Sequence, residues 1–128
     1  MESMKMAVNA YQNVQVDAAF LGASPHELIG KLMDRAIEAI AEAKEQMRSG
    51  DISGKSQNIK IAIAIITDGL RGSLNVEAGG ELAQNLDNLY DYMARQLLNA
   101  HAQNNLAVLD EIVSLLKVVK SGWDGIKP

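Results

Sequence analysis

The chain has 128 residues and a formal net charge of −4; 48% of the residues are hydrophobic and 22% are charged. This length suits a single domain, and the composition is that of a globular protein, which excludes an intrinsically disordered chain. The twelve basic residues form no run, which argues against nucleic acid as a partner, and the absence of cysteine excludes disulfides and thiolate metal sites.

Residues 1–23 are predicted to form an irregular N-terminal arm. The apolar residues of this stretch are too few and too unevenly spaced for a bundle helix; they include Val8, Tyr11, Val14 and Val16. The stretch also lacks the continuous apolar core of a signal peptide, and no apolar run approaches the ~18 residues of a membrane span. We therefore expect a cytoplasmic protein that does not insert into the membrane.

The first predicted helix covers residues 24–49. Ser24 suits the N-cap, Pro25 suits the first helical position, and Glu27 completes a capping box. Apolar residues then recur at helical spacing until Gly50, and glutamates occupy the opposite face. This pattern predicts a regular amphipathic helix.

The second predicted helix, 53–75, is the hardest to read. In IKIAIAI (59–65), isoleucine alternates with lysine or alanine, which is the period of a strand. A lone strand among helices would leave its backbone groups unpaired, so a helix is favoured. On a helical wheel one apolar face suits the core; it holds Ile59, Ile63, Ile66, Leu70 and Leu74. Ile61 and Ile65 fall on roughly the opposite side, and Gly69 and Gly72 continue their row.

Two further helices are predicted at 80–101 and 105–121, followed by Trp123, which we expect to fold back over the end of the bundle. Tyr92 is expected to face a groove beside the third helix, and Asn85, about two turns earlier on the same edge, is a candidate contact to a partner backbone. The interpretation of Asn85 as a solvated polar residue stays equally open. The low aromatic content of 4% also favours helices. The predicted fold is all-α, an antiparallel up-and-down four-helix bundle formed by a single domain over 1–128.

These helices carry more apolar surface than one core requires. Val108 and Leu115 widen the apolar arc of the last helix beyond the ~100° stripe of a surface helix, and Leu98 points away from the core line of the third. Contiguous exposed apolar patches usually mark interaction sites. Ile61 and Ile65 are therefore candidate partner-binding residues. The alternatives are that they pack under the N-terminal arm or form the seam of a self-associating bundle, which would be a weak homodimer.

Enzymatic chemistry has little support in the sequence. The two histidines, His26 and His101, lack the Glu-x-x-His spacing of a di-iron bundle. A histidine phosphotransfer bundle using His101 is the rival hypothesis, but the lysine and glycine that would steady the phosphate are absent beside it, so a solvated histidine at a helix end is favoured. We expect no cofactor, no metal and no catalytic residue.

Several motifs occur together in one order: AYQNVQV, ASPHELIGKLMDRAIEAI, AIITDGLRGSL and GGELAQNLDNLYDYM, with a tryptophan after the last helix. In this combination, from about Ala10 to Trp123, the chain resembles the FliS family of flagellar export chaperones. It departs from the family pattern in KLMDRA, where Met33 and Arg35 replace an aromatic residue and a glycine.

The resemblance implies a cytoplasmic bundle that binds the disordered C-terminal segment of flagellin, prevents premature polymerisation and delivers the subunit for export. Family members are also linked, less uniformly, to an anti-sigma factor and to the export-gate membrane protein. The predicted partner-binding residues are Val8, Tyr11, Ile61, Ile65, Gly69, Gly72, Asn85 and Tyr92. The resemblance supports Val8 and Tyr11 as residues of an arm that covers the groove until flagellin displaces it.

Overall fold

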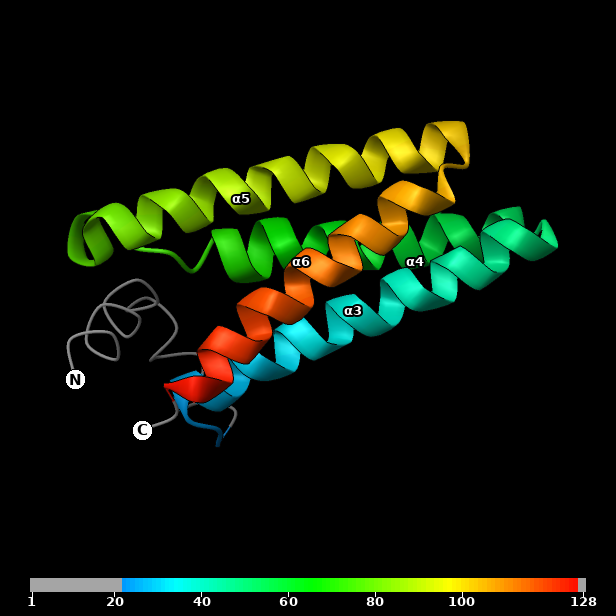
Figure 1. Cartoon of the computed structure of the whole chain (residues 1–128). Coiled ribbons are helices and arrows are strands. Elements are labelled where there is room, and N and C mark those ends of the chain that lie inside the picture. The colour runs from blue at the N-terminus through cyan, green and yellow to red at the C-terminus, as the bar shows by residue number, and fades with distance from the viewer. Residues whose placement is uncertain (1–21, 127–128) are drawn as a thin grey trace.

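The computed structural model describes residues 22–126, and within them every regular element is helical. The elements are α3 (Pro25–Ser49), α4 (Ile52–Ala64), the π-helix η2 (Ile65–Arg71), α5 (Val76–Gln103) and α6 (Leu106–Gly125). Helix η2 continues α4 without a break, so the described residues form four rods (Figure 1). The predicted all-α four-helix bundle is confirmed.

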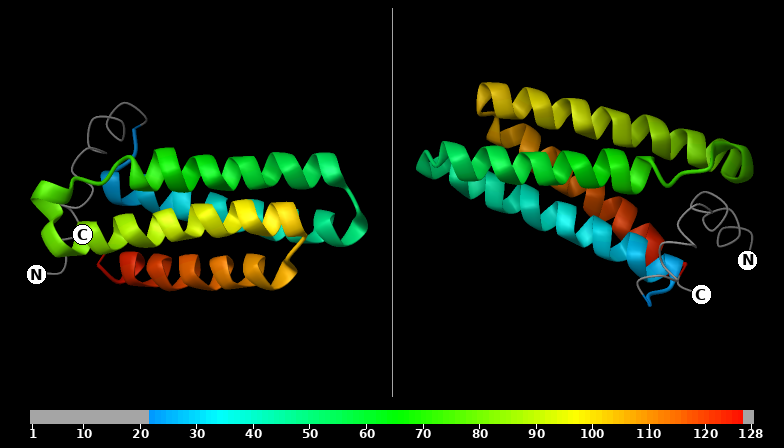
Figure 2. Two further views of the ribbon diagram at one scale, coloured as in Figure 1. Left: turned by 90° about the horizontal axis from the view of Figure 1, so that it is seen from above. Right: turned by 180° about the vertical axis from the view of Figure 1, so that it is seen from behind.

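Rods that follow one another in the chain are neighbours in space (Figure 2). Helix α3 packs against α4, η2 and α6, and α5 packs against α4, η2 and α6, which is the arrangement of an up-and-down bundle. The axes of α5 and α6 meet at the turn between them and diverge toward the opposite end of the bundle (Figure 1).

Local sequence signals account for most of the helix ends. Ser24 caps α3 by accepting a hydrogen bond from the backbone N–H of Glu27 at 3.1 Å, as the capping box predicts. Gly50 ends this helix in the left-handed conformation, with φ +81°, which glycine adopts without strain. The third rod begins at Val76, earlier than the predicted 80, because Asn75 caps an additional turn before a break at Gly80, where φ is +58°.

The core is built from small and branched apolar side chains on all four rods. The largest fully buried members are Tyr90, Ile29, Met33, Ile40, Ile59, Ile66, Leu70, Met93, Leu97, Leu109 and Ile112. Alanines at 36, 39, 43, 62, 83 and 100 are also fully buried, which allows the helices to approach closely. Of the two tyrosines of α5, Tyr90 seals the core and Tyr92 lies outside it, as predicted.

The second rod differs from the helical wheel. The wheel placed Ile61 and Ile65 opposite the core, whereas both side chains are half-buried and pack against the core from its edge. In α4 the buried residues include Asn58 and Ala62, while Ile63 is only half-buried, so the buried face lies nearer to Ile61 than the wheel placed it. A π-turn takes more residues than an α-turn, so each residue of η2 turns the rod by less than 100° and Leu70 lies less far round the rod than the wheel places it. The centre of the buried face therefore shifts toward Ile61 and Ile65.

Trp123 closes one end of the bundle against the first turn of α3. Its ring stacks on His26 with centroids 4.6 Å apart and an interplanar angle of 11°. The indole N–H donates to the His26 carbonyl at 2.9 Å, and His26 Nε2 donates to the Trp123 carbonyl at 2.7 Å. The predicted packing of Trp123 over the bundle end is confirmed, although α6 continues past the predicted end at 121 to Gly125.

Candidate functional site

Two apolar flanks run along the outside of the bundle. The first lies between α3 and the α4–η2 rod. Gln46 of α3 accepts a hydrogen bond from Asn58 Nδ2 at 2.8 Å, and Leu32 of α3 packs over Gly69, so the row between Asn58 and Gly69 faces α3. Ile61 and Ile65 occupy this row. We define the α3/α4 flank as the half-buried side chains Leu28, Leu32, Ile61 and Ile65.

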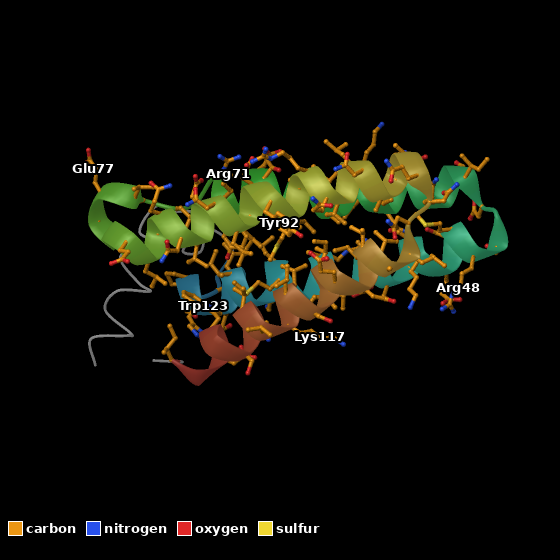
Figure 3. The ribbon with its side chains drawn as sticks, turned by 45° about the horizontal axis from the view of Figure 1, so that its top comes forward. Arg48, Arg71, Glu77, Tyr92, Lys117 and Trp123 are labelled. Carbon is orange, nitrogen blue, oxygen red and sulfur yellow. The ribbon has the colours of Figure 1, made fainter. Side chains whose placement is uncertain are left out.

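The second flank lies between α5 and α6, which are bridged by a hydrogen bond from the Tyr92 hydroxyl to the Glu111 carboxylate. Figure 3 shows the labelled Tyr92 between the two helices. Helical spacing from this bridge places further apolar residues on the same side of each helix. We define the α5/α6 flank as Leu82, Leu89, Tyr92, Val108, Leu115 and Val118.

The α5/α6 flank is the more open of the two. Tyr92 is 40% exposed and Val118 is 71% exposed, and the remaining members are half-buried against the core. Asn85 lies two turns before Tyr92 and is exposed. The hydrogen bond to Glu111 raises the pKa of Tyr92, because the carboxylate stabilises the protonated hydroxyl.

The glycines predicted to admit a foreign backbone have intramolecular explanations. A Cβ added at Gly69 would lie 3.3 Å from Leu32 Cδ1, so the close approach at this position comes from α3. A Cβ added at Gly72 would lie 2.5 Å from the carbonyl oxygen of Asp68, where the chain closes η2 with a hydrogen bond from Gly72 N–H to Thr67 O at 2.9 Å. Gly72 is therefore required by the rod itself, and the tight approach at Gly69 comes from within the bundle.

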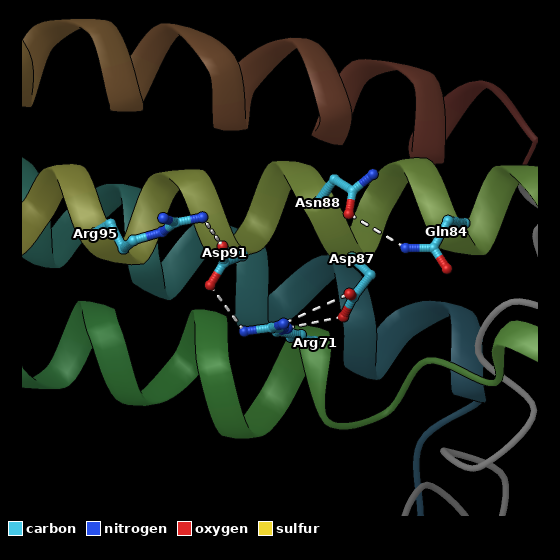
Figure 4. A network of polar contacts seen from close by, with 6 residues as sticks. All are labelled: Arg71, Gln84, Asp87, Asn88, Asp91 and Arg95. Atoms are coloured by element: carbon cyan, nitrogen blue, oxygen red, sulfur yellow. Dashed lines mark hydrogen bonds and ion pairs between the residues drawn. The ribbon is translucent and has the colours of Figure 1, made fainter.

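An ionic network fixes η2 to α5 (Figure 4). Arg71 donates through Nε to Asp87 at 2.7 Å and through Nη1 to Asp91 at 3.0 Å, and Asp91 also pairs with Arg95. The hydrogen bond to Asp87 is the main cause of a raised pKa for Arg71. Sequence reasoning missed this network, although the i, i+4 spacing of Asp87, Asp91 and Arg95 on one helix face was visible.

Neither histidine is arranged for chemistry. His26 belongs to the stacked closure with Trp123. His101 is half-buried, and its Nδ1 is buried without a hydrogen-bond partner, which corrects the prediction of a solvated side chain. The burial arises because the end of α5 packs over α4, where Lys55 donates to the His101 carbonyl. Within residues 22–126, no group of His, Cys, Asp or Glu side chains is positioned to hold a metal ion.

A small pocket lies where the α3–α4 turn meets the α5–α6 turn. Its volume is about 190 Å³, and its lining includes Lys55, Asp51 and Ile52 from the start of the second rod. Val8 and Tyr11, the two predicted site residues of the arm, lie outside the described residues. Over the helices that the structure describes, none is both long enough and apolar enough to cross a membrane.

Comparison with known proteins gives a consistent result. The model of the family described as "Flagellar protein FliS" matches residues 7–128. The chain is 47% identical to the flagellar secretion chaperone FliSB of Pseudomonas aeruginosa, with 98% of each chain covered. It is 40% identical to FliS of Salmonella typhimurium, covering 94% of this chain and 90% of that protein. It is 38% identical to FliS of Vibrio cholerae, covering 98% of this chain and 91% of that protein.

Proposed function

The chain belongs to the FliS family and is a chaperone of flagellar export rather than an enzyme, and we propose that it binds the C-terminal segment of flagellin. In this proposal the chaperone acts in the cytosol before export. It covers the apolar helical face through which flagellin subunits would otherwise polymerise, and it delivers the subunit to the export apparatus.

The observation that carries the proposal is the pair of apolar flanks. A monomer of this size rarely leaves apolar side chains aligned along two helix pairs unless they bind something. A disordered segment that folds into short amphipathic helices would match these flanks in shape and chemistry. Ile61 and Ile65 would anchor one helix of the segment, and Tyr92 with Val118 would anchor another.

The energetics favour a long interface over a single contact. Burying one apolar side chain completely contributes ~1.5–3 kcal/mol, and the flank residues are already half-covered, so each contributes less. Ordering a disordered segment costs about 2–5 kcal/mol or more. Several anchors on both flanks are therefore needed, which supports a partner that wraps around the bundle.

A matched pair of valine substitutions tests the proposal by calorimetry with a C-terminal flagellin segment. Val118→Ala removes about two methylene equivalents from the α5/α6 flank and should weaken binding by roughly tenfold. Val76→Ala makes the same change at an exposed position outside both flanks, so its affinity should equal that of the unmodified protein. Ile65→Ala removes apolar surface from the α3/α4 flank and should likewise weaken binding of the segment.

Failure of the unmodified chaperone to bind the segment would refute the proposal. Equal affinities for the Val118→Ala, Ile65→Ala and Val76→Ala proteins would show that flagellin binds elsewhere. A stable dimer that persists in excess segment would instead favour the self-associating bundle, in which the flanks form a seam between two copies. Sedimentation of the same samples distinguishes these results.

A further inference from the structure

Lys55 is a buried lysine without an acidic partner. Its residue exposure is 6%, and it forms no salt bridge with the described residues. Its ammonium group donates to two neutral oxygens, the His101 carbonyl at 3.2 Å and Asn104 Oδ1 at 2.6 Å. An ammonium group carries three donors, so one remains beyond these two bonds. A buried charge normally acquires an ionic partner, and none of residues 22–126 supplies one to this lysine.

Further donors gather around the same place. Lys55 and Asn104 line the pocket of about 190 Å³, together with Gln46 and the first residues of α4. Gln46 uses its carboxamide oxygen to accept from Asn58, and its carboxamide nitrogen lies over Gly54 near the Asp51 carboxylate. The N-terminus of α4 borders the pocket as well, and the positive end of a helix dipole favours an anion.

The pocket also holds the one acidic group that would oppose an anion. The Asp51 carboxylate lines the pocket, but its Oδ1 accepts from Gly54 N–H at 3.0 Å and serves as the N-cap of α4. Its charge is thus partly compensated by the helix end that it caps. Lys55, with one ammonium donor left over, is then the cationic partner for a second carboxylate in the pocket.

Two of the residues that line the pocket are apolar. Met47 and Ile52 line it, and Ile52 is 73% exposed, the most exposed of the large hydrophobic residues described. Sites for drug-sized ligands occupy about 300–1,000 Å³, so this pocket is too small for one. An apolar residue that ends in a carboxylate matches both its size and its chemistry.

We propose that this pocket binds the C-terminal carboxylate of the partner chain, with the last side chain of the partner packed on Met47 and Ile52. The inference rests on the proposed function, since a flagellin C-terminal segment ends in such a carboxylate. It adds a polar anchor at one end of the bundle, which fixes the direction in which the segment lies along the flanks. Capture of chain termini by charged and backbone donors is a recurring mode of peptide recognition.

The test compares two forms of the flagellin C-terminal segment, one with a free carboxylate and one amidated, by calorimetry with the full-length chaperone. The free carboxylate should bind at least about tenfold more tightly, the size expected for a hydrogen bond to a charged group. Lys55→Met, which keeps the apolar stem, should bind both forms equally. Lys60→Met, a change at an exposed lysine of the same helix, should keep the preference.

A second measurement keeps the inference falsifiable if Lys55→Met does not fold. N-acetyl-leucine, titrated into the isotope-labelled unmodified protein, should shift the amide signals of Ile52 and Asn104, and N-acetyl-leucinamide should not. Equal affinity of the two segments for the unmodified chaperone would overturn the inference while leaving the proposed function intact. Absence of binding by both segments would refute the proposed function and this inference with it.

Discussion

Replacing Trp123 tests how the two ends of the described chain are joined. Trp123 is 7% exposed, stacks on His26 and exchanges two hydrogen bonds with it. Trp123→Ala removes the stack and leaves a cavity at the bundle end. Truncation of a buried tryptophan costs about 3–5 kcal/mol, a large share of the ~5–15 kcal/mol that stabilises a domain of this kind.

A graded series separates packing from hydrogen bonding. Trp123→Phe keeps a ring on His26 and loses the indole N–H bond, which should cost about 1 kcal/mol beyond the loss of ring area. Leu98→Ala, a truncation at a side chain that is 56% exposed, is the control and should change stability by less than about 0.5 kcal/mol. Thermal and urea unfolding of all three variants are followed by circular dichroism. Tryptophan fluorescence is unsuitable because the Trp123 substitutions remove the only tryptophan of the chain.

The expected order of stability is the unmodified protein with Leu98→Ala, then Trp123→Phe, then Trp123→Ala. The last should melt at least about 10 °C lower. A Trp123→Ala protein that melts with the unmodified protein would show that the closure is absent in solution. The description of α6 as fixed to the first turn of α3 would then be wrong.

Three further predictions concern helix ends and the interhelical bridge. Gly72→Ala should destabilise the protein by about 1–3 kcal/mol, because the added Cβ meets a backbone carbonyl. Gly122→Ala, which has open space around it, should stabilise α6 by about 0.5–1 kcal/mol. Urea unfolding measures both changes. Glu111 raises the pKa of Tyr92 through their hydrogen bond. This bond stabilises the fold fully below the ordinary tyrosine pKa of about 10, and its contribution is lost as the pH rises through the raised pKa. Tyr92→Phe should remove this loss of stability at alkaline pH. Asp51→Ala should cost about 1 kcal/mol by uncapping α4, and Asp51→Asn, which also caps, should restore most of it.

Much of the fold could be predicted because it depends on local signals. The capping box at Ser24 and the apolar spacing that follows it predict α3 closely. The exposed Leu98 and Tyr92 were also predicted, since both lie on α5, where the spacing is regular. The helical wheel works wherever the backbone turns by a constant angle per residue.

The remaining features depend on contacts between segments distant in sequence. The wheel misplaced Ile61 and Ile65 because Asn58 and Ala62, which it left out of the core face, are buried, and because η2 lowers the turn angle per residue after Ile65. The closure of η2 at Gly72 depends on a single backbone contact. The burial of Lys55 depends on its contact with the end of α5, which follows only from the packing of the rods. The pairing of Arg71 with α5 is hidden for the same reason.

Isoleucine-methyl NMR of the chaperone with the flagellin C-terminal segment tests the central claim most directly. The account predicts that the methyl signals of Ile61 and Ile65 shift and show intermolecular contacts to the segment. The signals of Ile40 and Ile112, which are fully buried in the core, should stay unchanged. Binding that leaves the Ile61 and Ile65 methyl signals in place, without contacts to the segment, would contradict the α3/α4 flank as a flagellin-binding surface.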